Sequence, residues 1–351
     1  MKSKKNKLGS ILFATQGSIN TASTRFRVLS FIDKFNKNGV ATKVLQLPPG
    51  EQPIMRFIFL LNIFLNAPKH QIIFIQKVLL PIWMLHILKI LNKHIVYDWD
   101  DALYSPPPSD IFTTRKIKSN KNKLKHGLPI YELVICGNKN LERYTNRFNQ
   151  KTTVVPTSVD EKQFAHTKTR NHELIYIGWT GKSENLIYLN QLRDVFIKLE
   201  NQYKGEVRVK IVSDKPLYID GVDIIDNIAW QLENEVTDIE SFDIGIMPLS
   251  DDEWTRGKCA FKLLQYMAAG VPCIGSPVGA NSEVITHNYD GILVSSTEEW
   301  SQALEELINQ PEKRKFLASH AIESIKQKYS IDSAYEILLY ALQETLNPNQ
   351  S

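Results

Sequence analysis

Two lysines one helical turn apart, Lys258 and Lys262, are the residues of this sequence best suited to bind an anion. They lie at the start of an apolar segment in which Phe261, Leu264 and Met267 recur at helical spacing. Cations are unfavourable at the amino end of a helix, because that end already carries partial positive charge. A phosphate bound to free backbone N–H groups between the lysines would compensate for this. We therefore predict that both lysines lie in the first turns of a helix and bind an anion; the alternative is two solvated surface lysines.

The same segment ends in a pattern typical of a buried sheet. Gly270 and Pro272 predict the end of the helix, because glycine tolerates a left-handed cap and proline cannot continue the turn. The short apolar run 273–275 then predicts a buried parallel strand. Gln265 follows the two lysines at helical spacing, so its amide is expected on the same face of the helix.

Three carboxylates, Asp98, Asp100 and Asp101, directly follow a predicted strand at 95–97. Like charges repel, so a fold that keeps them together gains something by it. They can accept hydrogen bonds from sugar hydroxyl groups. They can instead hold Mg²⁺ or Mn²⁺, which prefer oxygen ligands, and Asp98-Trp99-Asp100 formally fits an Asp-x-Asp metal motif. The third interpretation is a loop with a helix cap and a salt bridge to the basic residues nearby.

Other predicted strand ends carry residues suited to a ligand. Gly17 lies in a polar loop after the first strand, where glycine permits close backbone approach. Arg25 and Arg27 are two residues apart and point to different faces of a helix, so at most one of them faces the ligand. The run 178–182, Gly-Trp-Thr-Gly-Lys, separates a strand from a helix and fits a phosphate-binding loop.

Predicted strands alternate with helices through both halves of the chain, which indicates α/β architecture with parallel doubly wound sheets. The first half carries strands at 11–14, 42–47, 72–75, 95–97, 133–136 and 153–155. The second half carries strands at 174–177, 207–212, 223–225, 244–247, 273–275 and 292–294, with helices that include 186–200 and 298–309.

At 351 residues the chain is too long for one ordinary hydrophobic core. We expect a Rossmann-like domain at 1–157, a polar linker at 158–171, a second Rossmann-like domain at 172–330, and a closing amphipathic helix with a tail at 331–351. Ligands of such sheets bind at the carboxyl ends of the strands. The predicted site is therefore a cleft between the two domains.

Composition narrows the class of protein. Hydrophobic residues make up 43% and charged residues 23%, as in soluble globular proteins, and a net charge of +4 gives no argument for a nucleic-acid partner. Cys136, Cys259 and Cys273 are odd in number and lack metal-ligand spacing, which suits a reducing cytosol. We find no signal peptide and expect a cytoplasmic protein.

Two features suggest contact with the inner face of the cell membrane. Lysines are concentrated in the amino-terminal tail at 2–7, and a second basic run extends from Arg115 to Lys125. The segments 54–65 and 78–91 are strongly apolar, yet neither approaches the roughly 20 apolar residues that a membrane span needs. We expect peripheral attachment to anionic lipid; loose surface charge is the alternative.

The stretch KLLQYMAAGVPCIGSPVG, residues 262–279, resembles the donor-binding segment of the family-four retaining glycosyltransferases (glycosyl transferases group 1), which have the two-domain GT-B fold. In that family a glutamate, seven residues and a second glutamate precede an A-x-G-x-P run. Here Gly257 occupies the first glutamate position and Gln265 the second. The resemblance covers nearly the whole chain and is strongest at 172–295.

The resemblance implies a role for each candidate residue. It implies catalytic or leaving-group roles for Asp100, Lys258 and Lys262. Donor-binding roles fall to Gly17, Gly181, Lys182, Cys259, Ala260, Phe261 and Gln265. Acceptor-binding roles fall to Arg25, Asp98, Asp101 and Asn138. No metal and no cofactor is expected, because lysines and helix amino ends would neutralise the leaving diphosphate.

The function implied is transfer of a sugar from a nucleotide sugar to a hydroxyl group of a sugar or lipid-linked acceptor, with retention, in assembly of cell-surface polysaccharide or glycolipid. Two alternatives stay open. A nucleotide-sugar 2-epimerase of similar fold would need carboxylates and a histidine in the cleft. A non-catalytic nucleotide-sugar-binding homologue would fit the departures at Gly257 and Gln265.

Overall fold

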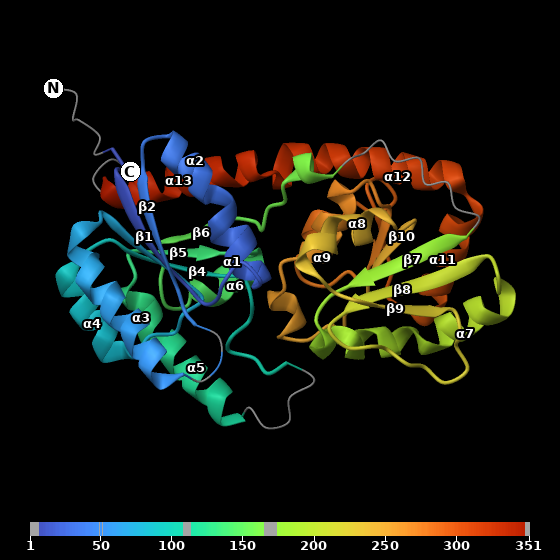
Figure 1. Ribbon diagram of the computed structural model, residues 1–351, viewed down its shortest axis with the longest axis horizontal. Coiled ribbons are helices and arrows are strands. Elements are labelled where there is room, and N and C mark those ends of the chain that lie inside the picture. The colour runs from blue at the N-terminus through green and yellow to red at the C-terminus, as the bar shows by residue number, and fades with distance from the viewer. Residues whose placement is uncertain (1–6, 49, 51, 108–113, 165–173, 348–351) are drawn as a thin grey trace.

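Two parallel six-stranded sheets, each covered by helices, form the two halves of the molecule (Figure 1). The computed structural model describes residues 7–48, 50, 52–107, 114–164 and 174–347. The predicted α/β architecture with two doubly wound sheets is confirmed, and the arrangement is the GT-B fold.

The first sheet has the strand order β2-β1-β3-β4-β5-β6. Its strands are β1 (Ser10–Thr15), β2 (Ala41–Gln46), β3 (Ile72–Gln76), β4 (Ile95–Trp99), β5 (Leu133–Cys136) and β6 (Thr152–Val154). Its helices are α1 (Ala22–Thr24), α2 (Ser30–Lys37), α3 (Pro53–Asn66), α4 (Ile82–Leu91), α5 (Thr114–Gly127) and α6 (Lys139–Thr145). Successive connections run to opposite sides of β1, so the loops after β1 and β3 border the crevice in which such sheets bind ligands.

The second sheet repeats this plan with the order β12-β11-β10-β7-β8-β9. Its strands are β7 (Ile175–Thr180), β8 (Val207–Ser213), β9 (Ile225–Ala229), β10 (Ile244–Met247), β11 (Cys273–Gly275) and β12 (Ile292–Leu293). Its helices are α7 (Arg193–Gln202), α8 (Glu235–Glu240), α9 (Phe261–Ala268), α10 (Asn281–Val284), α11 (Thr297–Asn309) and α12 (Pro311–Ser324). Here the order reverses between β7 and β10.

Most predicted strands lie within two residues of those observed; β7 ends three residues beyond the predicted strand at 174–177, and the strand predicted at 223–225 overlaps β9 only at Ile225. β9 begins only at Ile225, because the backbone N–H groups of Asp223 and Ile224 each donate a 2.8 Å hydrogen bond to the carboxylate of Glu200 on α7. The helix predicted at 186–200 is also divided: a 3₁₀ segment, Ser183–Leu192, precedes α7.

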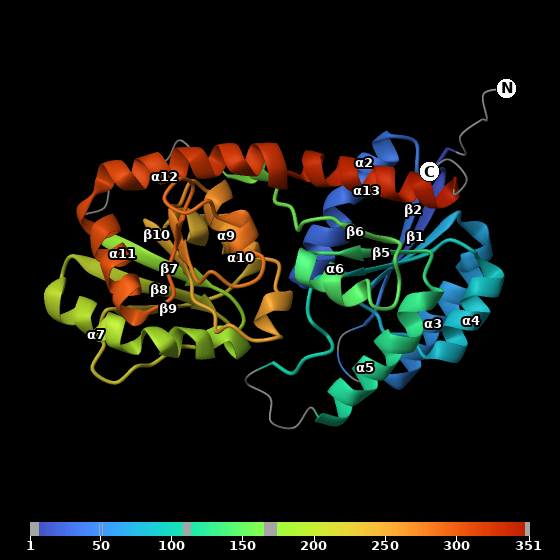
Figure 2. The same ribbon diagram turned by 180° about the vertical axis from the view of Figure 1, so that it is seen from behind.

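The last helix, α13 (Ile331–Leu346), packs on the first domain although it follows the second in sequence (Figures 1 and 2). The ring centres of Tyr335 and Phe35 lie 5.0 Å apart, and the hydroxyl group of Tyr335 accepts a 2.7 Å hydrogen bond from the side chain of Asn38. The chain therefore passes between the domains twice. The two passages meet where Val159 donates to the carbonyl of Tyr329 at 3.0 Å.

Buried charge organises the edge of the first sheet that faces the cleft. Arg27 lies in a π-helical turn, Arg25–Leu29, between α1 and α2. Its Nε donates to both carboxylate oxygens of Asp98, at 2.9 and 3.1 Å, and both side chains are almost completely buried. A further hydrogen bond of 3.0 Å reaches the carbonyl of Val155, so Arg27 ties β4 to the end of β6.

We expect Arg27→Ala to lower the free energy of unfolding by about 3–5 kcal/mol, because it leaves the buried Asp98 carboxylate unpaired. The matched control is Lys315→Ala. Its partner in an exposed ion pair is Glu312, so the change should cost less than about 1 kcal/mol. Urea denaturation followed by circular dichroism measures both. A loss in Arg27→Ala no larger than that of the control would contradict this assignment.

Candidate functional site

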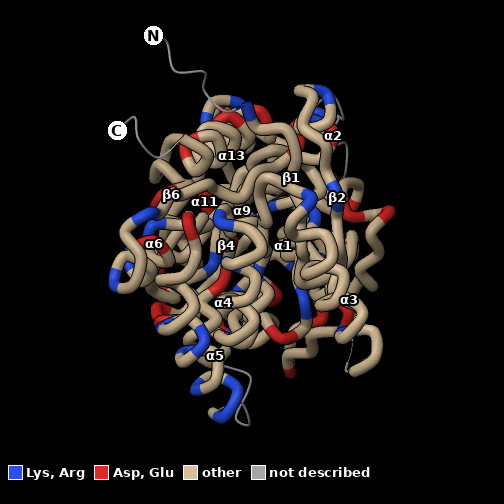
Figure 3. The backbone as a smooth tube through the Cα atoms, turned by 90° about the vertical axis from the view of Figure 1, so that its left-hand side faces the viewer, with Lys and Arg blue, Asp and Glu red and all other residues tan. Residues whose placement is uncertain are grey.

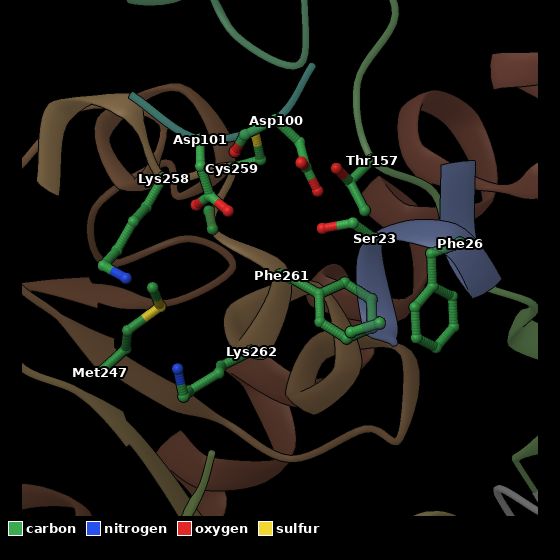
Figure 4. Close-up of a pocket in the computed structure, with 12 residues that line it drawn as sticks. Ser23, Phe26, Asp100, Asp101, Thr157, Met247, Lys258, Cys259, Phe261 and Lys262 are labelled. Carbon is green, nitrogen blue, oxygen red and sulfur yellow. The ribbon is translucent and has the colours of Figure 1, made fainter. Parts of the chain in front are cut away.

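The carboxyl ends of the two sheets meet at a pocket between the domains (Figure 4). The first domain contributes carboxylates to its lining, and the second contributes lysines. From the first domain come Ala22, Ser23, Phe26, Asp100, Asp101 and Thr157; from the second come Met247, Lys258, Cys259, Ala260, Phe261 and Lys262. The sequence therefore located one wall of the pocket at 258–262 and part of the other at Asp100 and Asp101.

The segment that carries the two lysines differs in local structure from the prediction. α9 begins at Phe261, so Lys262 lies in its first turn but Lys258 does not. Lys258 follows a 3₁₀ turn, Thr255–Gly257, and Ala260 adopts a left-handed conformation with φ of 53°. A non-glycine residue in this region is strained, and such strain concentrates at functional sites. The left-handed turn directs the loop before α9 into the cleft.

The ammonium groups of Lys258 and Lys262 point into the pocket on either side of Met247 (Figure 4). Lys258 donates a 2.9 Å hydrogen bond to the side-chain oxygen of Asn185. Lys262 lies over the ring of Trp179, at 5.2 Å from its centre. No carboxylate of the described residues forms an ion pair with either lysine.

Burial lowers the pKa of both lysines. For Lys262 burial and the nearby charge of Lys258 lower the pKa to about 7. For Lys258 burial again dominates, and the pKa is lowered although Asp101 and Glu184 oppose the shift. Two adjacent cations without a counter-ion are costly in a partly desolvated cleft. An anion bound between them would raise both pKa values towards their ordinary range and remove this cost.

Gly181 is required by the position of Lys262. A Cβ at residue 181 would lie 2.7 Å from Cε of Lys262 and 2.9 Å from the ring of Trp179. Gly181 therefore makes room for the lysine. The first three residues of the predicted phosphate loop, 178–180, are buried in β7. Gly178 packs under Phe242, whose ring would lie 1.9 Å from a Cβ at residue 178. Lys182 is exposed and does not line the pocket.

The opposite wall is organised by Lys77, a residue that is not among the candidates predicted from the sequence. Lys77 directly follows β3, has a φ of 63°, and pairs with both Asp100, at 3.0 Å, and Asp101. Burial alone would raise the pKa of Asp100, but the charges of Lys77 and Arg27 outweigh it and lower that pKa. The sequence signal that could have identified Lys77 is its position at the carboxyl end of β3, beside β4, where such sheets bind ligands.

Three predicted acceptor residues hold the fold instead of lining the pocket. Asp98 is occupied by Arg27. The side chain of Arg25 reaches the second domain and forms an ion pair with Glu235 at 2.6 Å. Beside it, the ring centres of Phe26 and Phe261 lie 4.1 Å apart. We therefore assign Asp98 and Arg25 structural roles. Of the acceptor candidates, Asp101 alone lines the pocket.

Asn138, the third of these residues, fastens the loop that carries Lys258. Its side-chain amide donates to the carbonyls of Gly257 and Lys258, both at 3.0 Å, while its oxygen caps α6 by accepting from the backbone of Leu141. Gly257 also packs directly on the first domain: a Cβ there would lie 2.5 Å from the Cβ of Ala102.

Of the remaining candidates, Gly17 and Gln265 lie outside the pocket lining, and Cys259 lies within it. Gly17 is packed against Thr21, whose hydroxyl would lie 2.2 Å from a Cβ at residue 17, and Gln265 is 4% exposed within α9. Neither lines the pocket. The thiol of Cys259 donates to the carbonyl of Asp100 at 3.2 Å, and burial raises its pKa well above the ordinary value, so it stays a neutral thiol.

Among the described residues no group of three His, Cys, Asp or Glu side chains is arranged to hold a metal ion. The Asp-x-Asp pattern does not supply free ligands, because Arg27 pairs with Asp98 and Lys77 pairs with Asp100. The three carboxylates of this cluster are thus paired with two cations of the protein itself, Arg27 and Lys77.

Residues 172–310 match the family model Glycosyl transferases group 1. This segment, which carries most of the second domain, is therefore similar to a group 1 glycosyltransferase domain. A curated relative, N-acetyl-alpha-D-glucosaminyl L-malate synthase of Bacillus anthracis, is 23% identical over 256 residues, which cover 66% of this chain and 65% of the relative. The predicted resemblance is confirmed at the level of this family.

Solved structures extend the fold to the whole chain. HepE of Anabaena, in complex with UDP and glucose, superposes with a TM-score of 0.69 at 14% identity, over 96% of this chain and 100% of HepE. Sucrose-phosphate synthase of Thermosynechococcus elongatus superposes with a TM-score of 0.70 at 12% identity, over 97% of this chain and 100% of the synthase. Both domains and their relative arrangement are therefore those of the GT-B fold.

The pKa of Lys262 leads to a prediction about nucleotide binding. Lys262 has to be protonated to bind a diphosphate, and its pKa without ligand is about 7. The affinity for a nucleoside diphosphate should therefore fall by up to about tenfold per pH unit between about pH 7 and pH 8.5, with uptake of a proton on binding. Calorimetry in two buffers of different ionisation enthalpy measures both quantities.

The matched control for this titration is Lys262→Arg, which keeps its charge over the whole range and also corrects for titration of the ligand. Its affinity should be nearly independent of pH. An equal pH dependence in both proteins, or none in the wild type, would show that Lys262 does not bind the diphosphate.

A second prediction separates the two roles of Asn138. Asn138→Ser keeps a side chain that caps α6 but removes the amide that holds the loop at 257–258. Nucleoside diphosphate affinity should fall by roughly tenfold, the value of one to two hydrogen bonds, while the melting temperature changes by only a few degrees. Unchanged affinity in a folded Asn138→Ser protein would mean that the loop does not need this support.

Proposed function

We propose that this protein is a glycosyltransferase that moves a sugar from a nucleoside diphosphate sugar to a hydroxyl acceptor. The observation that carries the proposal is a pair of lysines without an ion-pair partner among the described residues, Lys258 just before α9 and Lys262 in its first turn. They line a pocket between two Rossmann-like domains, the second of which matches the group 1 glycosyltransferase model at residues 172–310. HepE, which has the same fold, binds UDP and UDP-glucose, which supports a uridine nucleotide as the first donor to test.

The diphosphate of the donor would lie between Lys258 and Lys262, against the free N–H groups at the start of α9. Negative charge grows on this diphosphate as the bond to the sugar breaks, so groups aimed at it stabilise the transition state more than the ground state. The two lysines supply positive charge where other enzymes use a divalent cation, and we propose that transfer needs no metal.

The acceptor would approach from the first domain, where Ser23, Asp100, Asp101 and Thr157 line the pocket. Lys77 holds Asp100 ionised, so this carboxylate can accept a hydrogen bond from the attacking hydroxyl group. We propose retention at the anomeric carbon and a role in cell-surface polysaccharide or glycolipid assembly at the cytoplasmic face of the membrane. Both follow from the family resemblance. No described residue that lines the pocket is a histidine, which favours transfer over epimerisation.

The test is incubation with a panel of nucleoside diphosphate sugars, UDP-sugars first, with and without sugar and lipid-linked acceptors. A transferase releases free nucleoside diphosphate, faster with its acceptor, and EDTA should leave the rate nearly unchanged. Formation of a new nucleotide sugar would indicate an epimerase, and no conversion would indicate a binding protein. Loss of activity on chelation, restored by Mn²⁺, would overturn metal-independent transfer. The anomeric configuration of the product, determined by NMR, tests retention.

Two variants assign the steps of this reaction. Lys262→Ala should lower turnover by about 10²–10³-fold and weaken nucleotide binding. Asp100→Asn should lower turnover but leave nucleotide affinity unchanged, because Asp100 belongs to the acceptor wall. The control is Lys182→Ala, an exposed lysine outside the pocket, which should behave as wild type. Normal turnover in a folded Lys262→Ala protein would contradict the proposed site.

A further inference from the structure

The helices α3 and α4 are apolar on the side that faces solvent as well as on the side that faces the core. In α3, Phe59 and Ile63 are buried, yet Ile54 and Phe57 are 75% and 65% exposed. The exposed apolar residues of α3 are Ile54, Met55, Phe57, Ile58, Leu61 and Leu65, most of them three or four residues apart. A helix that is apolar all round is normally enclosed by protein or lipid.

α4 repeats this arrangement. Leu85 and Leu88 are buried, whereas Trp83 and Ile90 are 60% and 84% exposed. Ile87 and Leu91 are exposed on the same helix. Apolar side chains exposed singly are ordinary, but a set gathered on two helices indicates a surface that binds a partner.

The third helix beside them, α5, is strongly basic. Its basic residues are Arg115, Lys116, Lys118, Lys121, Lys123 and Lys125, and α3, α4 and α5 together contain no aspartate or glutamate. The three helices are neighbours on one surface. Gly127 of α5 lies against Leu85 of α4. The pKa of Lys123 on α5 is lowered mainly by burial and further by the positive charge of Arg56 on α3. Figure 3 shows this side of the molecule, with Lys and Arg along α5.

We infer that α3, α4 and α5 form a docking surface for an anionic lipid bilayer. The apolar side chains would enter the boundary between head groups and acyl chains, and the α5 cations would contact lipid phosphates. Charge identifies this occupant. A second copy of the chain, paired through the same face, would bring basic α5 helices together without any acidic residue of these helices to neutralise them. No helix among the described residues could itself cross a membrane, so the contact is peripheral.

This surface is joined to the acceptor wall of the pocket. The side chain of Asn120 on α5 donates a 3.0 Å hydrogen bond to the carbonyl of Leu103, two residues after Asp101. Docking would hold this loop at the membrane, which deepens the proposed function by favouring a lipid-linked acceptor. The docking surface itself is independent of that function, because it can be tested with no substrate present.

The experiment is sedimentation of the full chain with vesicles of phosphatidylcholine alone or mixed with phosphatidylglycerol. We expect binding to the anionic vesicles only, and weaker binding at high salt because exposed charges are screened. Lys116→Gln/Lys118→Gln/Lys121→Gln should lower the partition coefficient by up to about 100-fold at low salt. Trp83→Ala/Ile90→Ala should lower it by more than about tenfold, through loss of buried apolar area.

Matched controls change the same residue types elsewhere. Lys215→Gln/Lys326→Gln/Lys328→Gln removes three exposed lysines outside this surface, and Tyr218→Ala/Tyr340→Ala removes two aromatic rings that are 82% and 66% exposed. Both controls should bind as wild type, and circular dichroism verifies folding of every variant. Equal losses in variants and controls, binding equal with neutral and anionic vesicles, or a stable dimer dissociated by Trp83→Ala/Ile90→Ala would overturn the proposal.

Discussion

The constraint on which the site depends is the contact between the loop at 256–260 and the first domain. The side-chain amide of Asn138 donates to the carbonyls of Gly257 and Lys258, and its oxygen caps α6. The thiol of Cys259 adds a hydrogen bond to the backbone of Asp100. These contacts satisfy the polar groups of a buried loop that no strand or helix satisfies, as the cost of unpaired buried carbonyls requires. They also fix where the cations on one domain face the carboxylates on the other.

The two walls of the pocket handle charge in opposite ways. On the first domain Lys77 is paired with two carboxylates, and these outweigh burial and raise its pKa. On the second domain Lys262 has no such partner among the residues that the structure describes, and burial lowers its pKa to about 7. The described part of one pocket thus holds a buried lysine paired with two carboxylates and a second buried lysine without a counter-ion. That unmet charge is the reason why we propose this wall, and not the other, as the place for a diphosphate.

The sequence predicted what depends on local pattern. Parallel strands were recognisable as short apolar runs, such as 133–136 and 244–247, which are wholly buried in the structure. The lysine segment was recognisable because cations are rare at the amino end of a helix such as α9. Contacts between distant residues were not predictable. Lys77 shows no pattern by itself, since its role comes from strand order, which places β3 beside β4. Asp98 and Arg25 were assigned to the ligand because their buried or interdomain partners, Arg27 and Glu235, lie 71 and 210 residues away in the chain.

Gly257 shows how such distant contacts alter the meaning of a motif. The resemblance places a glutamate at this position in related enzymes, and the sequence alone presents glycine as a missing side chain. In the structure the space is occupied: a Cβ at residue 257 would lie 2.5 Å from the Cβ and 2.7 Å from the backbone nitrogen of Ala102. Any side chain would therefore hold the two domains apart at the point where Asn138 fastens them. Glycine at this position thus permits the close approach of the two domains, where the family pattern has a glutamate.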